Sequence, residues 1–236
     1  VKERKSGKSV FYNRNFHVEP TNLCVFNCRF CSYRRPAGAP DAWDYSVEEI
    51  MEQVEAHCRS GATEIHIVGG VHPRKDLYYY ADLIRKIRER IPSVAVKAFT
   101  AIELAYMIDK AGLSYHDGLV ILKEAGMQAI PGGGAEIFDE KIRKQICPEK
   151  GSAETWLAVH REAHRIGLKS NATILYGHIE QWADRIDHLD RLRSLQDETD
   201  GFDAFIPLKY RNRHNSMSEL GEVSVVEDMR MMAMAR

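Results

Sequence analysis

EPTNLCVFNCRFCSYRR, residues 19–35, places Cys24, Cys28 and Cys31 within one short loop after the first predicted strand. The chain has five cysteines, an odd number, so they are not the even, dispersed set of a small disulfide-bonded secreted protein. Thiols at this density ligate zinc or an iron–sulfur cluster. Structural zinc takes four ligands, usually as two separated pairs, and the sequence has no second pair. The spacing therefore favours a [4Fe–4S] cluster over zinc, with one iron left free for a small ligand.

The composition excludes several classes of protein. The 236 residues are 44% hydrophobic and 28% charged, which is typical of a globular chain. The net charge of −1 argues against a general binder of nucleic acid or membrane surfaces. No apolar run approaches the roughly 20 residues that span a bilayer. The N-terminal VKERKSGKSV has charges but no apolar stretch after them, so we expect no secretory signal and a cytoplasmic protein.

Short β-like runs alternate with helical patterns along the chain, which predicts βαβ units and a parallel sheet. The predicted strands are residues 15–19, 63–70, 94–100, 169–177 and 202–210, and residues 127–134 are predicted to form a further strand and a Gly-rich loop. The predicted helices are residues 46–61, 77–91, 102–111, 117–125, 139–146, 153–166, 179–196 and 225–235. With no linker and no repeat in the sequence, we expect one domain over residues 1–236.

Glycines and polar residues follow the predicted strands at five places: the cysteine loop, Gly69–Gly70, Pro131–Gly134, Gly177–Glu180 and Pro207–Asn215. In a barrel these loops all meet at the C-terminal face, where active sites are built, whereas an open doubly wound sheet would divide them around a switch point. The pattern favours a partial TIM-like (β/α)6 barrel of the α/β class. Its active site is expected at the C-terminal ends of the strands.

The cysteine spacing C-x3-C-x2-C, with Phe30 before the last cysteine, resembles the signature of the radical S-adenosylmethionine (SAM) superfamily. The resemblance implies that Cys24, Cys28 and Cys31 ligate a [4Fe–4S] cluster and that SAM is the second cofactor. Gly69–Gly70 is similar to the family's Gly-Gly turn, which binds the methionine amino group. Glycine suits such a turn because only a backbone without a side chain can approach a ligand closely.

The stretch T-x-L-x-G-x-x-E, with Thr173, Gly177 and Glu180, is similar to the family's G-x-I-x-G-x-x-E pattern near the adenine. It departs at the first glycine, where this chain has Thr173. Phe30 and Tyr33 are candidates to stack on the adenine, although Tyr33 could equally seal the cluster from water.

Further candidates come from single residues near the predicted loops. Glu136 is a candidate for holding the ribose hydroxyls, with a carboxylate at a helix start as the alternative. His72 and His178 follow loop glycines and could orient a carboxylate or move a proton, unless they are hydrogen-bonded packing residues.

Longer motifs resemble one branch of the superfamily, the aminofutalosine synthases of menaquinone biosynthesis. They are HVEPTNLC, CRFCSYRR, PGGGAEIFDEKIRKQICP, NATILYGHIE and FIPLKYRNRHN. The resemblance implies addition of the 5′-deoxyadenosyl radical to 3-[(1-carboxyvinyl)oxy]benzoate, giving 6-amino-6-deoxyfutalosine. The dehypoxanthine futalosine cyclases and the FO synthase subunits are the alternatives, but they tend to have Ala-Phe where this chain has Ser32-Tyr33. Members of the branch extend further at both ends, so we expect the chain to lack outer barrel units.

The substrate implied by this branch is a small aryl enol-ether dicarboxylate, and forked guanidinium groups suit its carboxylates. Arg211 and Arg213, after the last strand, are the first candidates, with solvated surface residues as the alternative. The reaction implies an electron donor such as a flavodoxin or ferredoxin. A non-catalytic cluster carrier would need a fourth cysteine, and we expect Cys58 and Cys147 to lie away from the cluster.

Overall fold

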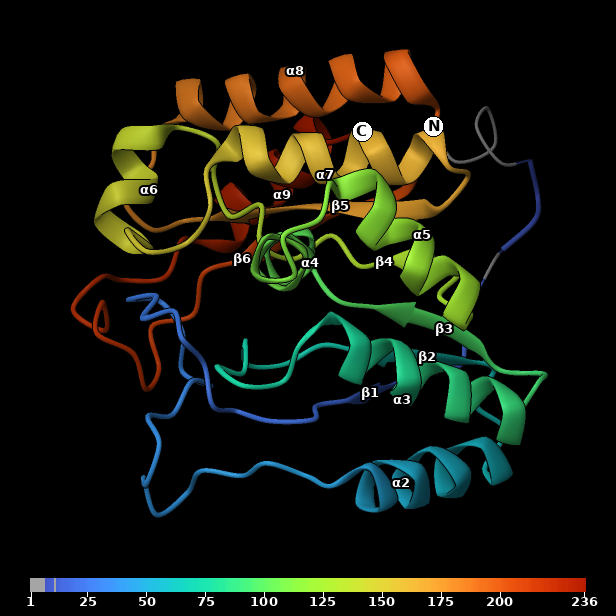
Figure 1. Ribbon diagram of the computed structural model, residues 1–236. Helices are drawn as coiled ribbons and strands as arrows, with labels where there is room; N and C mark the ends of the chain where they lie inside the picture. The colour runs from blue at the N-terminus through green and yellow to red at the C-terminus, as the bar shows by residue number, and fades with distance from the viewer. Residues whose placement is uncertain (1–6, 11) are drawn as a thin grey trace.

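The computed structural model describes residues 7–10 and 12–236, in which six parallel strands form a sheet in the order β1-β2-β3-β4-β5-β6 (Figure 1). The strands are β1 (Asn15–Val18), β2 (Glu64–Ile67), β3 (Ala95–Ala98), β4 (Ala129–Ile130), β5 (Lys169–Tyr176) and β6 (Phe202–Lys209). The sheet curves into a half-barrel, which confirms the fold expected from the sequence. Residues 1–6, which make up most of the segment used to argue against a secretory signal, lie outside the described residues.

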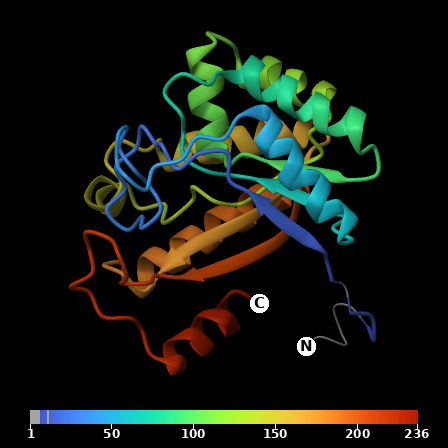
Figure 2. The same ribbon diagram turned by 90° about the horizontal axis from the view of Figure 1, so that it is seen from below.

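Helices cover the convex face of this curved sheet (Figures 1 and 2). They are α2 (Val47–Arg59), α3 (Leu77–Arg90), α4 (Ala101–Lys110), α5 (Tyr115–Ala125), α6 (Glu140–Ile146), α7 (Ala153–Arg165), α8 (Trp182–Thr199) and α9 (Val225–Met234). Most begin at a Ser, Thr or Asp whose side chain accepts the backbone N–H three residues on, as the predicted cap Ser46 does for Glu49. No helix in the described part of the chain is long and apolar enough to cross a membrane.

Along β2 and β3, buried apolar side chains alternate with polar ones, so the two faces of the sheet differ in polarity. Ile65 of β2 and Val96 of β3 are in register and fully buried in the hydrophobic core that contains the helices. The alternate residues of the same strands, among them His66 and Lys97, face the concave side. Each βαβ unit therefore buries one face of its strand and leaves the strand's C-terminal end open for function.

The fourth strand is short. A strand followed by a Gly-rich loop was expected over residues 127–134, and β4 contains only Ala129–Ile130. Pro131 has no N–H to donate to a neighbouring strand, and the three glycines after it form a loop. This loop lies against β5, since a Cβ atom on Gly132 would come within 2.7 Å of the Asn171 carbonyl oxygen. The glycines of the PGGG segment thus allow the loop after β4 to pack directly against the backbone of β5.

Three histidines between the sheet and the outer helices are buried in their neutral form. Ser170 Oγ of β5 lies 2.8 Å from both His160 Nδ1 and His164 Nε2 of α7. The Nε2 of His188 in α8 lies 2.9 Å from the Thr173 carbonyl oxygen. Burial lowers the pKa of His160 well below its usual value, that of His164 to about 4 and that of His188 to about 3. Protonating any of these imidazoles would place a positive charge away from water, which is unfavourable.

Acidification below about pH 6.5 is expected to destabilise the protein through these histidines. The unfolded chain binds more protons than the native state in this range, so the free energy of unfolding falls as the pH falls, for His164 until about pH 4. Urea unfolding at pH 7.5 and pH 5.0 should differ by about 2 kcal/mol or more. H164N should reduce this difference, and H116Q, which changes an exposed histidine, should leave it unchanged. Equal stability at both pH values would contradict the neutral assignment.

Candidate active site

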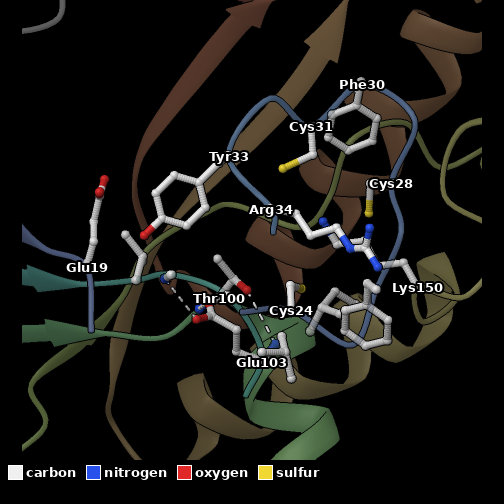
Figure 3. Close-up of a pocket in the computed structure, with 16 residues that line it drawn as sticks. Glu19, Cys24, Cys28, Phe30, Cys31, Tyr33, Arg34, Thr100, Glu103 and Lys150 are labelled. Carbon is white, nitrogen blue, oxygen red and sulfur yellow. Dashed lines mark hydrogen bonds between the residues drawn. The ribbon is translucent and has the colours of Figure 1, made fainter. Parts of the chain in front are cut away.

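The three cysteines of residues 19–35 line a cavity of about 250 Å³ at the C-terminal ends of the strands (Figure 3). Gly69 and Gly70, which follow β2, line the same cavity, as do the aromatic side chains of Phe30 and Tyr33. These seven residues were predicted from the sequence to serve one site, and the structure brings them together.

Backbone hydrogen bonds fix the path of the cysteine loop. The N–H of Val25, next to Cys24, donates to the Val71 carbonyl at 3.0 Å, and the N–H of Arg29 donates to the Ile146 carbonyl at 2.8 Å. The base of the loop is closed by Asn22, whose amide donates to the Asp41 carbonyl at 2.9 Å and accepts the Trp43 N–H at 2.8 Å. The loop is thus anchored on the segment after β2 and on the end of α6.

The Gly69–Gly70 turn lies against this loop so closely that no side chain fits. The N–H of Gly70 donates to the Thr21 carbonyl at 2.8 Å, and a Cβ atom on Gly70 would overlap the Leu23 carbonyl. The N–H of Gly69 donates to the Glu103 carboxylate at 3.2 Å. Glycine is required at this turn because two backbone segments approach each other directly.

Glu103 is a site residue that the sequence analysis missed. It is buried at the start of α4, where its carboxylate also accepts the Thr100 N–H at 2.7 Å, and it lines the cavity. Burial raises its pKa, and these N–H donors act in the opposite direction. The available signal was the capping-box pattern T-x-x-E directly after the third strand.

Two cations, Lys150 and Arg34, also line the cavity and were not predicted (Figure 3). Lys150 Nζ lies 2.5 Å from Glu136 Oε1 and 5.7 Å from the centre of the Phe30 ring. Burial alone would lower the pKa of Lys150, but the Glu136 carboxylate raises it above its usual value, so the side chain is charged. Glu136, a candidate for the ribose hydroxyls, is placed beside Lys150 rather than among the residues that line this cavity.

Cys147 lies against Cys28, so the expectation that it lies away from the cluster is wrong. Cys28 packs against the buried cluster of side chains that contains Cys147, and the neighbouring Cys147 thiol raises the pKa of the Cys28 thiol. Two further bonds hold the neighbouring segments together: Asn27 N–H donates to the Glu149 carboxylate at 2.8 Å, and Arg29 N–H donates to the Ile146 carbonyl at 2.8 Å. Sequence spacing could not reveal this contact because it joins segments more than a hundred residues apart.

The predicted adenine segment forms a separate buried cluster after β5. The Glu180 carboxylate accepts the Gly177 N–H at 2.6 Å and the His178 N–H at 2.9 Å, and it pairs with the Arg185 guanidinium. The side chains of His178 and Glu180 are fully buried. Thr173 donates its hydroxyl hydrogen to the Gly132 carbonyl at 2.6 Å. These residues fix the loops after β4 and β5 and are not among those that line the cysteine cavity.

The remaining predicted residues lie apart from this cavity. His72 is buried, its Nδ1 accepts the Arg74 and Lys75 N–H groups, and its Nε2 lies 3.4 Å from the Asp44 carboxylate. It lines a small neighbouring cavity that shares Gly70 and Glu103 with the main one.

The two candidate arginines lie on the exposed segment after β6. The Arg211 side chain is 69% exposed and pairs with Glu222 at 2.7 Å, and Arg213 is exposed. Neither is among the residues that line the cysteine cavity.

The donor set fits the cluster that the sequence predicts. Within the described residues, no group of three or more His, Cys, Asp or Glu side chains could hold a single metal ion. Three thiols around one cavity instead suit a cluster in which each cysteine binds a different iron atom. Gly69 and Gly70 line the same cavity.

Replacing Cys28 by alanine is expected to abolish stable cluster binding, because the loss of one of the three ligands leaves only two loop thiols at the cavity. C147S should retain the iron and sulfide of the unmodified protein, since the radical SAM signature uses only the three loop cysteines. Iron and sulfide analysis after anaerobic reconstitution measures both. Loss of the cluster in C147S would show that Cys147 is a fourth ligand and would favour a carrier over an enzyme.

Comparison with known proteins agrees with the fold and the site. Residues 18–192 match the family model described as Radical SAM superfamily. The chain is 46% identical over its whole length to an aminodeoxyfutalosine synthase of Thermus thermophilus, and it covers 64% of that protein. It is also 37% identical over its whole length to a 5-amino-6-(D-ribitylamino)uracil–L-tyrosine 4-hydroxyphenyl transferase of Methanoculleus marisnigri, of which it covers 65%. The chain therefore spans just under two thirds of the length of these curated relatives.

The crystal structure of methylornithine synthase has a similar fold, with a TM-score of 0.68 at 17% identity. The similarity covers 100% of this chain and 66% of that one. The half-barrel, the loop with three cysteines and the family match over most of the chain agree, and the chain belongs to the radical SAM superfamily.

Proposed function

We propose that the chain carries the catalytic core of an aminodeoxyfutalosine synthase, with residues 1–236 forming one domain. The observation that carries the proposal is the 46% identity to the Thermus thermophilus enzyme over the whole chain, against 37% to the hydroxyphenyl transferase. The substrate would be 3-[(1-carboxyvinyl)oxy]benzoate and the product 6-amino-6-deoxyfutalosine. The electron donor would be a flavodoxin or ferredoxin.

Several residues of the cavity have defined parts in this proposal. When bound, the cluster and SAM supply a 5′-deoxyadenosyl radical, and the protein provides binding, orientation and exclusion of water. Gly69 and Gly70 offer the backbone to the methionine amino group. Glu103 fixes this turn through its hydrogen bond to the Gly69 N–H. Phe30 and Tyr33 provide aromatic faces for the adenine.

The candidate residues that do not line the cysteine cavity also have roles in the proposal. His72 and His178 serve proton movement or carboxylate orientation, and Arg211 and Arg213 serve the substrate carboxylates. Thr173, Gly177 and Glu180 act on the nucleoside through the loops after β4 and β5 that they hold, and Glu136 acts through its pair with Lys150.

A second candidate function is suggested by the hydroxyphenyl transferase, which this chain also matches over its whole length. That protein's name specifies a ribitylaminouracil and tyrosine as its substrates. The two activities differ in where the adenosyl group ends: the synthase incorporates it in the product, so mass analysis separates them.

The test is an anaerobic assay of the reconstituted protein with dithionite, SAM and 3-[(1-carboxyvinyl)oxy]benzoate. A product that contains both the adenosyl group and the benzoate is expected, and it should disappear in C28A. A parallel reaction with 5-amino-6-ribitylaminouracil and tyrosine should give no coupled product. Coupling in the second reaction alone would overturn the assignment in favour of the transferase.

Replacing Gly70 by alanine is expected to weaken SAM binding by at least about tenfold, because the methyl group would push the turn away from the Leu23 carbonyl. Calorimetric titration of the cluster-loaded protein with SAM measures the change. G221A is the matched control, since a Cβ atom on Gly221 meets no neighbour within 4 Å. Wild-type affinity in G70A would show that SAM binding does not depend on this turn.

A further inference from the structure

Lys150 is a cation of the cysteine cavity whose charge has no part in the reaction described above, and it forms an ion pair with Glu136. Its side chain is only 14% exposed and that of Glu136 only 10%, so the pair is largely shielded from solvent. A surface lysine would be solvated and screened, whereas a charge in this position acts strongly on its neighbours. The pair therefore affects the electrostatics of the cavity.

The backbone around Glu136 is shaped to present its carboxylate to Lys150. Glu136 has a φ of 49°, in the left-handed region that side-chain-bearing residues seldom adopt. Its carbonyl accepts the Leu175 N–H at 2.7 Å, which ties this conformation to β5. Strained backbone of this kind persists where the surrounding structure holds it, and it concentrates at functional sites.

Lys150 lies beside one of the cluster ligands. Lys150 and Cys28 line the same cavity, where a charge shielded from water acts more strongly on its neighbours than a solvated one. Both side chains lie on the same side of the cavity (Figure 3). The ammonium also lies 5.7 Å from the centre of the Phe30 ring, within the range of a cation–π contact.

We propose that Lys150 sets the reduction potential of the cluster held by Cys24, Cys28 and Cys31, and that Glu136 positions its ammonium and moderates its charge. Reduction adds one electron, taken from a low-potential donor, and makes the cluster more negative by one charge. A positive charge beside Cys28 stabilises the reduced form more than the oxidised form, and net charge is one of the properties that set such potentials. The inference holds for either candidate substrate, because it concerns the cluster before any substrate binds.

The test is a redox titration of the reconstituted protein without SAM or substrate, in which electron paramagnetic resonance measures the reduced fraction. K150M is expected to lower the ratio of reduced to oxidised cluster by about tenfold at a fixed potential, equal to about 59 mV for one electron. E136Q should raise the ratio, because it removes a negative charge and keeps the shape. K150R keeps the charge and should restore the wild-type ratio.

K144M is the matched control, because Lys144 is an exposed lysine on α6. Its ratio should equal that of the unmodified protein. Iron and sulfide contents are compared first, so that a variant with damaged cluster binding is not mistaken for a shifted potential. If K150M loses the cluster, E136Q still tests the proposal, because it changes the charge in the opposite direction and should raise the ratio of reduced to oxidised cluster. An unchanged ratio in K150M, or a fall in E136Q, would overturn the proposal.

Discussion

The anchoring of the cysteine loop between two distant segments is the constraint on which the rest of the site depends. The backbone N–H and C=O groups of an irregular loop have no partners within a helix or strand, so they need partners elsewhere. In this loop the N–H groups of Val25 and Arg29 donate to carbonyls after β2 and at the end of α6. These bonds bring the thiols to the C-terminal edge of the sheet. They also bring the Gly69–Gly70 turn against the base of the loop, where only glycine fits.

Buried carboxylates organise this edge of the half-barrel in a recurring way. Glu103 accepts backbone N–H groups at the turn after β2, and Glu180 does the same at the turn after β5. Glu136 instead pairs with Lys150. Each negative charge is neutralised by N–H donors or a cation, as burial requires. These contacts fix the turns after β2 and β5.

Local pattern was sufficient to predict most of the fold. Strand alternation and helix periodicity depend on neighbouring residues, and the helices α2 to α9 lie close to their expected ranges. The fourth strand and the Gly-rich loop after it were also expected within residues 127–134, and the strand contains only Ala129–Ile130. The cysteines, the glycine turn, Phe30 and Tyr33 were found because their spacing is short and distinctive.

The sequence by itself determined the order of the elements, the cysteine loop and the family chemistry, because these follow from spacing within a few residues. Only the tertiary structure decided which distant groups meet. It placed Cys147 against Cys28 and Lys150 beside the cysteines, and it put Arg211 on an exposed ion pair with Glu222. These contacts arise when the parallel sheet curves and brings the ends of different strands to one edge. Their distances are set by that closure, which no local pattern specifies.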